Sequence, residues 1–381
     1  MDGKDFETGT EPVRKEAVSG GVSVSTIPKD TSRRITSLRF LLIVLVVFIH
    51  NNFTDSSNMV DVFSQGLFGK WTQRLISGGI AECAVPLFFM FAAYIQERKA
   101  DSYGTLLRKK ARSLLAPYLI WIGINGFYYA GLKLILLKIA PGIIKNPDTT
   151  ALSWPAEQWF YGIVGYAPGY THPRFAPQFW FIRDLMILTA LSPVLRLFAR
   201  RFQAAFLAGI SMVLFTPLNV HFVAGQALFF YGVGMLAAYH DVPFFEKTDR
   251  ITWPEAALFF LGTFILRYVF YEGNSVIHCL MVISACVVLL KFSALIVSND
   301  RLYSAAAYLA GFSFFLFAIH SPRLQKTLQM AWIHFFPMKN GFFCLFEYFG
   351  VSALTIVIGT AAGIGLKKIC PPLFRLLNGG R

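Results

Sequence analysis

Long apolar runs alternate with short polar segments along almost the whole chain. By the ~20-residue length needed to cross a bilayer, about ten of these runs are predicted to be membrane-spanning helices. They cover roughly residues 36–53, 79–96, 114–136, 178–197, 203–219, 222–240, 254–272, 275–297, 304–321 and 345–366. The pattern predicts an all-α fold, a polytopic integral membrane helix bundle of about ten transmembrane helices.

Basic residues predict the orientation of these helices. With the amino terminus inside, the cytoplasmic segments hold about 23 Lys and Arg and the outer segments about 9, so both termini are predicted to be cytoplasmic. The expected organisation is a disordered cytoplasmic tail at residues 1–32, a transmembrane domain at residues 33–370 and a short cytoplasmic tail at residues 371–381. Residues 1–32 are not expected to be a signal peptide, because no small-residue cleavage site follows the first apolar run.

Composition excludes the soluble globular class. The 381 residues are 55% hydrophobic and only 15% charged. The net charge of +14 comes from basic loops, so a nucleic-acid partner is not expected. The cysteines form no CxxC pair and the histidines are scattered over different predicted helices, so neither a disulfide framework nor a metal site is expected.

The first apolar run, residues 37–50, carries two ionisable residues, Arg39 and His50. Eleven residues at 100° each return to within roughly 20° of the starting face, so the two side chains share one face, roughly 16 Å apart along the axis. An ionisable group in hydrocarbon costs at least ~2.5–3.5 kcal/mol at the helix centre and is a functional hypothesis by default. In the alternative, Arg39 snorkels to the cytoplasmic headgroups and His50 lies at the outer interface.

Glu82 lies in the outer part of the second predicted span, where Pro86 is expected to kink the helix. A carboxylate on this kinked helix is a candidate neighbour for the imidazole of His50. In the alternative, Glu82 is hydrated by water at the outer interface.

A basic cluster precedes the third predicted span. Arg108 and Arg112 are four residues apart and therefore share one face of a helix. Paired guanidinium groups suit a diphosphate or phosphoadenosine group, which they can bind bidentately. In the alternative, this is a topogenic basic loop that contacts anionic lipids.

The longest connection, residues 137–177, is rich in Trp and Tyr, which is typical of an interfacial belt and also suits a sugar-binding surface. It leads into Trp180, Arg183 and Asp184 at the start of the fourth predicted span. Adjacent helical residues point about 100° apart, so Arg183 and Asp184 are expected to find different partners inside the bundle.

His320 ends the ninth predicted span, after a Phe-rich run. His221 and His278 also lie near outer helix ends, which weakens the signal of His320 taken alone.

Five of these elements, in order, resemble membrane acyltransferase family 3. They are Arg39-x10-His50, the run Val85 to Phe89, the basic segment Arg108 to Pro117, the segment Phe179 to Leu185, and the Phe-rich run ending in His320. The resemblance covers residues 33 to about 366. The sequence departs from the family where Phe91 to Tyr94 replaces a Ser-Gly-Tyr type ending, and where the fourth-span motif is of the Trp-Phe-x-Arg-Asp type rather than the Trp-Ser-Leu-x-x-Glu type.

The resemblance implies a multi-pass O-acyltransferase of the bacterial inner (plasma) membrane. Such proteins move acyl groups, often acetyl, from cytoplasmic acyl-coenzyme A to hydroxyls of cell-envelope glycans or lipid-linked sugars. The expected partners are therefore acyl-CoA (acetyl-CoA) as donor substrate, a glycan or lipid-linked sugar as acceptor, and membrane lipids, without a metal.

Acyl transfer to a sugar hydroxyl needs a base, a group that stabilises the oxyanion and a binding site for the donor. His50 is the expected general base, because an unperturbed imidazole has a pKa near 6.5, and Glu82 is the candidate to orient it. Arg39 and Arg183 are expected where phosphate or oxyanion charge develops. The remaining expectations are Arg108 and Arg112 for the coenzyme A phosphates, and Trp180, Asp184 and His320 for the acceptor.

Two other functional classes fit some of these features. A transporter or flippase for a glycan or lipid would also use buried Arg and His, and it predicts movement of a labelled lipid without consumption of acyl-coenzyme A. A non-catalytic membrane sensor or scaffold would explain the aromatic residues but leaves the aligned Arg39 and His50 unused. The enzyme is preferred, mainly because of the family resemblance.

Overall fold

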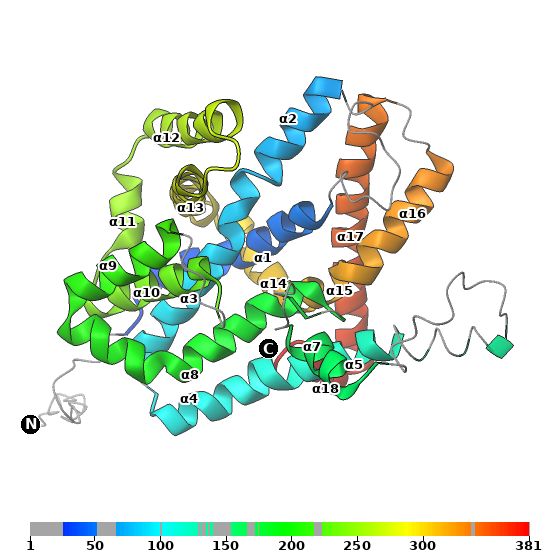
Figure 1. The fold of residues 1–381 in the computed structure, drawn as a ribbon, viewed down its shortest axis with the longest axis horizontal. Coiled ribbons are helices and arrows are strands. Elements are labelled where there is room, and N and C mark those ends of the chain that lie inside the picture. The colour runs from blue at the N-terminus through cyan, green and yellow to red at the C-terminus, as the bar shows by residue number, and fades with distance from the viewer. Residues whose placement is uncertain are drawn as a thin grey trace, which may run out of the picture.

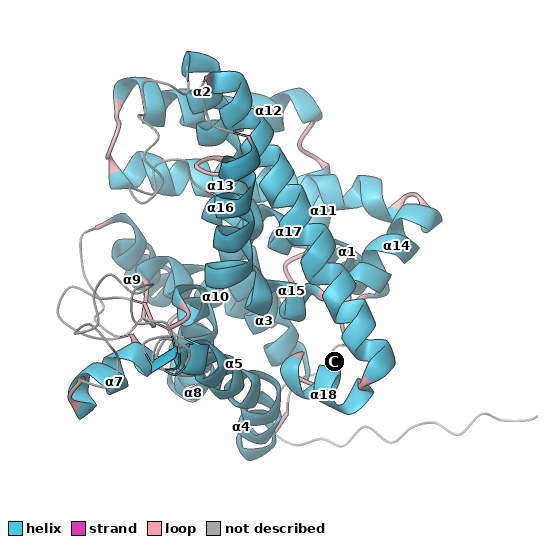
Figure 2. Cartoon of the chain, turned by 90° about the vertical axis from the view of Figure 1, so that its right-hand side faces the viewer, coloured by secondary structure: helices cyan, strands magenta, loops and turns pink. Residues whose placement is uncertain are grey.

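The computed structural model describes residues 26–51, 66–99, 101–128, 131, 135, 138–139, 154–165, 172–173, 175–216, 223–336 and 340–380. Within these residues every regular element is a helix, so the predicted all-α class is confirmed (Figures 1 and 2). Most of the segment predicted to be a disordered tail lies outside the described residues. The first helix begins at Lys29, slightly before the predicted domain boundary at residue 33.

The helices follow one another through the chain in a single series. The longer ones, in order, are α1 (Lys29–His50), α2 (Gly66–Ile76), α3 (Ala84–Lys99), α4 (Tyr103–Lys110), α5 (Ala116–Phe127), α7 (Ala156–Val164), α8 (Trp180–Arg201), α9 (Gln203–Phe215), α10 (Gly225–Tyr239), α11 (Phe244–Asp249), α12 (Trp253–Ile265), α13 (Ser275–Val297), α14 (Asp300–Ala310), α15 (Ser313–Ile319), α16 (Gln325–Phe335), α17 (Gly341–Ile369) and α18 (Pro371–Leu377). Short 3-10 or π-helical turns join some of them: η3 (Ile80–Cys83), η4 (Ala111–Leu115), η9 (Pro177–Phe179), η10 (Leu266–Phe270) and η11 (His320–Leu324).

Helix α1 runs through the middle of the bundle (Figure 1). It packs against α3, α13, α14, α15 and α17. Ile35, Leu38, Leu42 and Val46 recur every three or four residues and are almost completely buried, which is the pattern of a helix face in a core. At 22 residues the helix is about 33 Å long, so side chains on it can connect distant parts of the molecule.

Four helical stretches are long and apolar enough to cross a bilayer: Phe68–Lys99, Trp253–Phe270, Ser275–Val297 and Gly341–Ile369. The pair Asp300–Ala310 and Ser313–Phe335, bent by 51°, adds a fifth if it forms one broken span. A membrane protein is therefore supported. The predicted total of about ten spans and the cytoplasmic position of both termini stay predictions.

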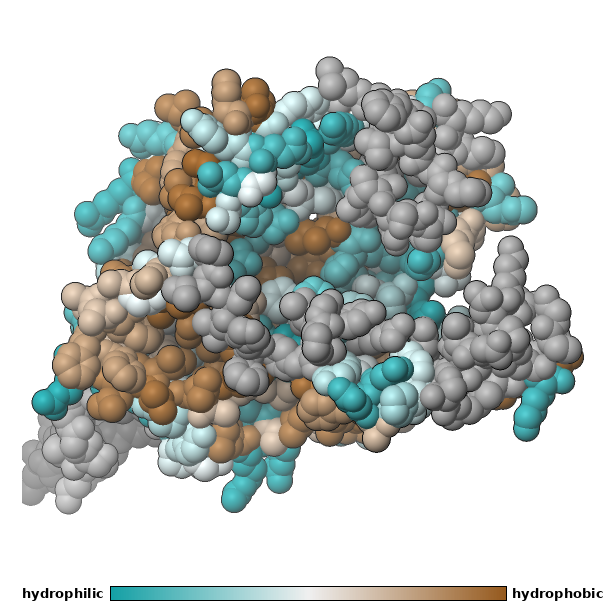
Figure 3. Space-filling model, in the orientation of Figure 1, coloured by the Kyte–Doolittle hydropathy of each residue, from teal (hydrophilic) through white to brown (hydrophobic). Residues whose placement is uncertain are grey.

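The outside of the bundle also suits lipid. In Figure 3, hydrophobic residues gather over the region of α8 and α9, and the face is hollowed near its centre. Large apolar side chains there are exposed, among them Leu197, Phe198 and Met212. Contiguous apolar surface of this kind is typical of a surface that contacts membrane or another apolar partner.

Helices α3 and α10 pack closely because a glycine lies at their contact. A Cβ on Gly234 would lie 2.2 Å from the backbone oxygen of Met90, so only glycine permits this approach. Hydrogen bonds add to this contact, since Gln96 Nε2 donates to the Tyr231 hydroxyl at 2.8 Å.

Polar caps fix where several helices begin. The Asn274 side chain accepts hydrogen bonds from Val276 N and Ile277 N at the start of α13, and Asn299 and Asn340 do the same for α14 and α17. Each cap satisfies amide groups that have no partner within the helix. These asparagine caps thereby define where one apolar helix ends and the next begins.

The segment predicted to be a short carboxyl-terminal tail packs back onto the bundle as α18. Phe374 is 1% exposed and its ring lies 5.5 Å from that of Phe312. The Asn378 side chain accepts a hydrogen bond from Phe315 N and donates one to Gly311 O, so it holds the beginning of α15.

Candidate functional site

Helix α1 carries Arg39 and His50 on one continuous helix, so the face that the sequence predicts for them exists in the fold. Arg39 is half-buried and lines a cavity, whereas His50 is exposed at the carboxyl-terminal end of the helix. The two residues therefore lie at different places along the same face of α1.

His50 pairs with His320. Their ring centroids are 5.2 Å apart, and His320 is fully buried. We refer to these two residues as the histidine pair. His172 is close enough to act electrostatically on His50. The structure thus brings together two histidines that are far apart in the sequence.

An interruption of helical geometry just after α15 fixes the position of His320. Pro322 cannot donate a backbone hydrogen bond and disfavours helical geometry at the residue before it, and Ser321 accordingly has φ −124° and ψ 152°. Gln178, 2% exposed, donates to the carbonyls of Ser321 and Ala318. This side chain therefore fixes the broken backbone beside His320.

The two ring nitrogens of His320 have different surroundings. Nδ1 lies 2.7 Å from the carbonyl oxygen of Phe317, within hydrogen-bond distance. Nε2 is buried and has no hydrogen-bond partner among the described residues. If Nδ1 carries the proton that Phe317 accepts, Nε2 presents a free lone pair.

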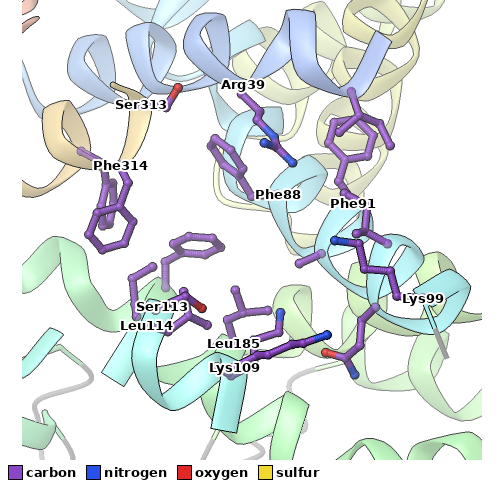
Figure 4. Close-up of a pocket in the computed structure, with 18 of the residues that line it drawn as sticks. Arg39, Phe88, Phe91, Lys99, Lys109, Ser113, Leu114, Leu185, Ser313 and Phe314 are labelled. Atoms are coloured by element: carbon purple, nitrogen blue, oxygen red, sulfur yellow. The ribbon is translucent and has the colours of Figure 1, made fainter. Parts of the chain in front are cut away.

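A cavity of about 420 Å³ lies on the Arg39 side of this arrangement (Figure 4). Its charged lining residues are Arg39, Lys99, Asp101, Lys109 and Lys110. We call it the basic cavity. Lys109 Nζ binds the Asp101 carboxylate at 2.6 Å, so the charges lining the cavity sum to a cationic excess. Its volume lies within the range of about 300–1,000 Å³ typical of small-molecule sites.

The rest of the basic cavity is mostly apolar. In Figure 4, Arg39 projects from α1 into the space, with Lys99 and Lys109 toward one side and Ser313 and Phe314 toward the other. The apolar lining includes Ile43, Phe88, Phe91, Phe181, Phe314 and Phe317. A ligand with an anionic end and an apolar end matches this distribution.

Arg108 and Arg112, the predicted phosphate-binding pair, lie on the same helical segment but are exposed and are not among the residues that line the basic cavity. Sequence reasoning missed Lys109 and Lys110, which do line it. Buried Leu106, four residues before Lys110, marks the inward face of α4, and this spacing was the available signal.

Arg183 and Asp184 bind each other, a pairing that the sequence did not predict, and each also has a different partner elsewhere in the bundle, as predicted. Arg183 Nε and one terminal guanidinium nitrogen donate to the same Asp184 oxygen at 2.9 and 2.8 Å. The two Cβ atoms point in different directions on the helix, but the arginine side chain is long enough to reach the neighbouring carboxylate. Arg183 also donates to Val164 O, and the Asp184 carboxylate accepts from Ala224 N, each at 2.9 Å. The pair therefore ties the start of α8 to α7 and α10.

Trp180 begins α8 and is half-buried. Its ring stacks on that of His172, with centroids 5.9 Å apart and planes inclined by 18°. His172 is exposed, so this stacked pair offers an aromatic surface near His50.

Glu82 lies in η3, half-buried, and its carboxylate makes no hydrogen bond or ion pair with His50. It interacts electrostatically with Arg267 instead. The structure therefore does not bring Glu82 into direct contact with the histidine pair.

A buried polar cluster at the carboxyl-terminal end of α1 escaped the sequence reasoning. The amide of Asn51 donates to Tyr348 O at 2.9 Å and to the Ser352 hydroxyl at 3.1 Å. Glu347, one residue before Tyr348, is 0% exposed, and neither carboxylate oxygen makes a well-formed hydrogen bond in the part of the chain that the structure describes, although the Gln329 side chain lies close enough to act on it. A carboxylate within the long apolar run of α17 was the signal that could have found it.

No group of three or more His, Cys, Asp or Glu residues suited to a metal ion occurs among the described residues.

Comparison with known proteins gives two matches. Residues 33–365 match the family model described as an acyltransferase domain. The succinoglycan biosynthesis protein ExoH of Rhizobium meliloti (strain 1021) is 27% identical over 370 residues, which cover 92% of this chain and 93% of that protein. No solved structure matches the chain.

Proposed function

This chain belongs to the acyltransferase family whose model spans residues 33–365, and on that basis we propose that it is an integral membrane O-acyltransferase acting on a cell-envelope glycan or lipid-linked sugar. The family match confirms the resemblance seen in the sequence motifs, and the chain is an acyltransferase. The name of its relative, a succinoglycan biosynthesis protein, supports a glycan acceptor.

One observation carries the proposal: a basic cavity and a histidine pair lie along one face of α1. Arg39 lines the cavity and His50 belongs to the pair. Eleven residues of helix separate them, roughly 16 Å along the axis. A donor with phosphates at one end and a thioester at the other fits this separation of functions.

The proposed donor is a cytoplasmic acyl-coenzyme A, with acetyl as the expected acyl group. Lys99, Lys109 and Lys110, together with Arg39, supply positive charge for its phosphates. Arg108 and Arg112, exposed on the same segment, attract the anionic donor toward the opening. The apolar walls suit the pantetheine arm and the acyl group.

In the proposed reaction, His50 accepts the proton of the acceptor hydroxyl as its oxygen attacks the thioester carbon. A carbon–oxygen bond forms, the carbon–sulfur bond breaks, and the proton passes to the leaving thiolate of coenzyme A. The products are the acyl ester and free coenzyme A. His320 holds the ring of His50 in position, since it is buried beside it.

The other predicted site residues take less direct roles. Arg183 and Asp184 position the start of α8, and through it Trp180, which is proposed to contact the sugar together with His172. The role of Glu82 in orienting His50 stays a prediction, since the charged group that acts on Glu82 is Arg267.

The proposed location is a bacterial inner membrane, with about ten spans and both termini in the cytoplasm. The excess of Lys and Arg in the predicted cytoplasmic segments supports this orientation. It places the basic cavity toward the cytoplasmic donor and His50 toward the envelope.

Turnover of radiolabelled acetyl-coenzyme A by purified protein in nanodiscs tests the proposal. Wild type is expected to release label from coenzyme A, and His50→Ala is expected to lose this activity while remaining folded. His334→Ala is the matched control, because His334 lies on α16 with its ring against Phe335, and its activity should equal that of wild type. Full activity in His50→Ala would refute the role of His50. Movement of a labelled lipid without loss of label from any acyl-coenzyme A would support the transporter instead.

A further inference from the structure

Phe317 belongs both to the basic cavity and to the surroundings of the histidine pair. Its side chain lines the cavity, and its ring centroid lies 6.0 Å from that of His320. Its carbonyl oxygen is the group within hydrogen-bond distance of His320 Nδ1. Phe317 thus lies both on the cavity wall and beside His320.

Neighbouring aromatic rings hold this side chain in place. The Phe317 centroid lies 5.5 Å from that of Phe179, 5.9 Å from that of Phe181 and 6.2 Å from that of Phe314. Phe317 itself is only 4% exposed. In such close packing a ring cannot move aside without displacing its neighbours, so it acts as a fixed wall.

Helix α1 shows how far the cavity extends. Ile43 is the lining residue on α1 nearest in sequence to His50, and it precedes His50 by seven residues. Seven residues correspond to about 10 Å of helix. A thioester that reacts beside His50 therefore has to extend beyond Ile43, and Phe317 is a lining residue whose ring contacts the histidine pair.

We propose that Phe317 sets the size of the acyl group that the enzyme transfers, by limiting the space beside the histidine pair. This inference rests on the proposed function. With the thioester carbon at His50, a short acyl group fits beside the Phe317 ring, whereas a longer chain meets this ring and its aromatic neighbours. Phe317 is therefore a residue that determines specificity, and the base remains His50.

The experiment compares acetyl-, butyryl- and hexanoyl-coenzyme A as donors for wild type, Phe317→Ala and Phe88→Ala in nanodiscs. Phe88 is the matched control, because it lines the same cavity and its ring pairs with Phe181 rather than with a histidine. In wild type we expect turnover to fall as the acyl group lengthens. In Phe317→Ala the ratio of kcat/KM for butyryl to that for acetyl should rise at least ~10-fold, since each methylene in a fitted apolar pocket is worth about 10-fold or more.

Each outcome decides between the readings. An unchanged ratio in Phe317→Ala, or an equal rise in Phe88→Ala, would overturn the inference while wild-type turnover leaves the proposed function intact. If wild type turned over none of the three acyl-coenzyme A donors, the proposed function would be wrong, and this inference would be wrong with it. If Phe317→Ala does not fold, Phe317→Leu should give a smaller rise in the same direction. Folded Phe317 variants that use no donor would also overturn the inference, because the ring would then support the histidines rather than limit the donor.

Discussion

The two ends of α1 hold their buried ionisable groups in different ways. Near its amino-terminal end, Arg34 is 2% exposed, and its two terminal guanidinium nitrogens bind both oxygens of Asp249 at 2.7 and 2.8 Å, with the guanidinium over the Phe245 ring. Its Nε has no partner among the described residues, but the charge itself is paired. Near the carboxyl-terminal end, His320 Nε2 and both oxygens of Glu347 are buried without a well-formed hydrogen bond in the described part of the chain, and no opposite charge is paired with Glu347 there.

The buried polar groups at the two ends of α1 therefore differ in what they contribute to the free energy of unfolding. A buried charge that is paired and hydrogen-bonded can be part of a scaffold, whereas an unsatisfied buried polar group costs about 1–3 kcal/mol, more when charged. Proteins keep such destabilising, unsatisfied polar groups mainly at functional sites. The comparison therefore assigns the amino-terminal end of α1 to stability and the carboxyl-terminal end to chemistry, and the following experiments test that assignment.

The largest expected effect is on turnover in His320→Phe. Phenylalanine keeps an aromatic ring against Phe317 but removes both nitrogens, so the fold should persist while turnover falls about 10²-fold, the usual cost of a misplaced catalytic group, here His50. Turnover is measured with labelled acyl-coenzyme A, and folding by size-exclusion chromatography. A folded variant with wild-type turnover would show that the nitrogens of His320 do not position His50.

Asp249→Ala should mainly affect stability. It leaves Arg34 buried without its carboxylate, and we expect the free energy of unfolding to fall by about 3 kcal/mol, near the lower end for a broken buried pair because Asp249 is partly exposed. Thermal unfolding in detergent measures this loss, and the specific activity of the folded fraction should not change. A stable but inactive variant would contradict the division between the two ends.

Glu347→Gln should show the opposite behaviour. The amide has nearly the same shape and carries no charge, so stability should be unchanged or higher, while turnover should fall about tenfold if the carboxylate contributes electrostatically to the site. Glu246→Gln, on the surface of α11, is the control and should change neither quantity. Lower stability with normal turnover in Glu347→Gln would place this carboxylate in the scaffold.

The smallest expected effects concern donor binding. Replacing Lys109 and Lys110 together with Ala should raise KM for acyl-coenzyme A several-fold, with kcat nearly unchanged, because the charges that line the basic cavity are lost. Replacing the exposed Arg108 and Arg112 should raise KM less, and the increase should disappear at high salt, since exposed charges are screened. A larger increase in KM from the Arg108 and Arg112 replacements would show that these two arginines, as predicted from the sequence, bind the phosphates.

Sequence was most informative where a single residue contrasts with its surroundings. Arg39 and His50 stand out in an apolar run, and the helix repeat alone puts them on one face. Lys109 and Lys110 lie in a run of basic residues, where only the packing of α4 decides which side chains face the cavity. The partnership of His50 with His320 depends on a helix break near Pro322 and on tertiary packing, which helix periodicity does not contain.

The contact of Asn378 with α15 has a consequence for biosynthesis. Its side chain binds Phe315 N and Gly311 O, at the start of α15, the helix that carries Phe317 and leads into His320. The first half of the histidine pair is made early, on α1, but its partner helix gains this support only after residue 378 has been synthesised. Nascent chains that stop short of this residue are therefore expected to insert into the membrane without a correctly held histidine pair. Such truncated products should be inactive.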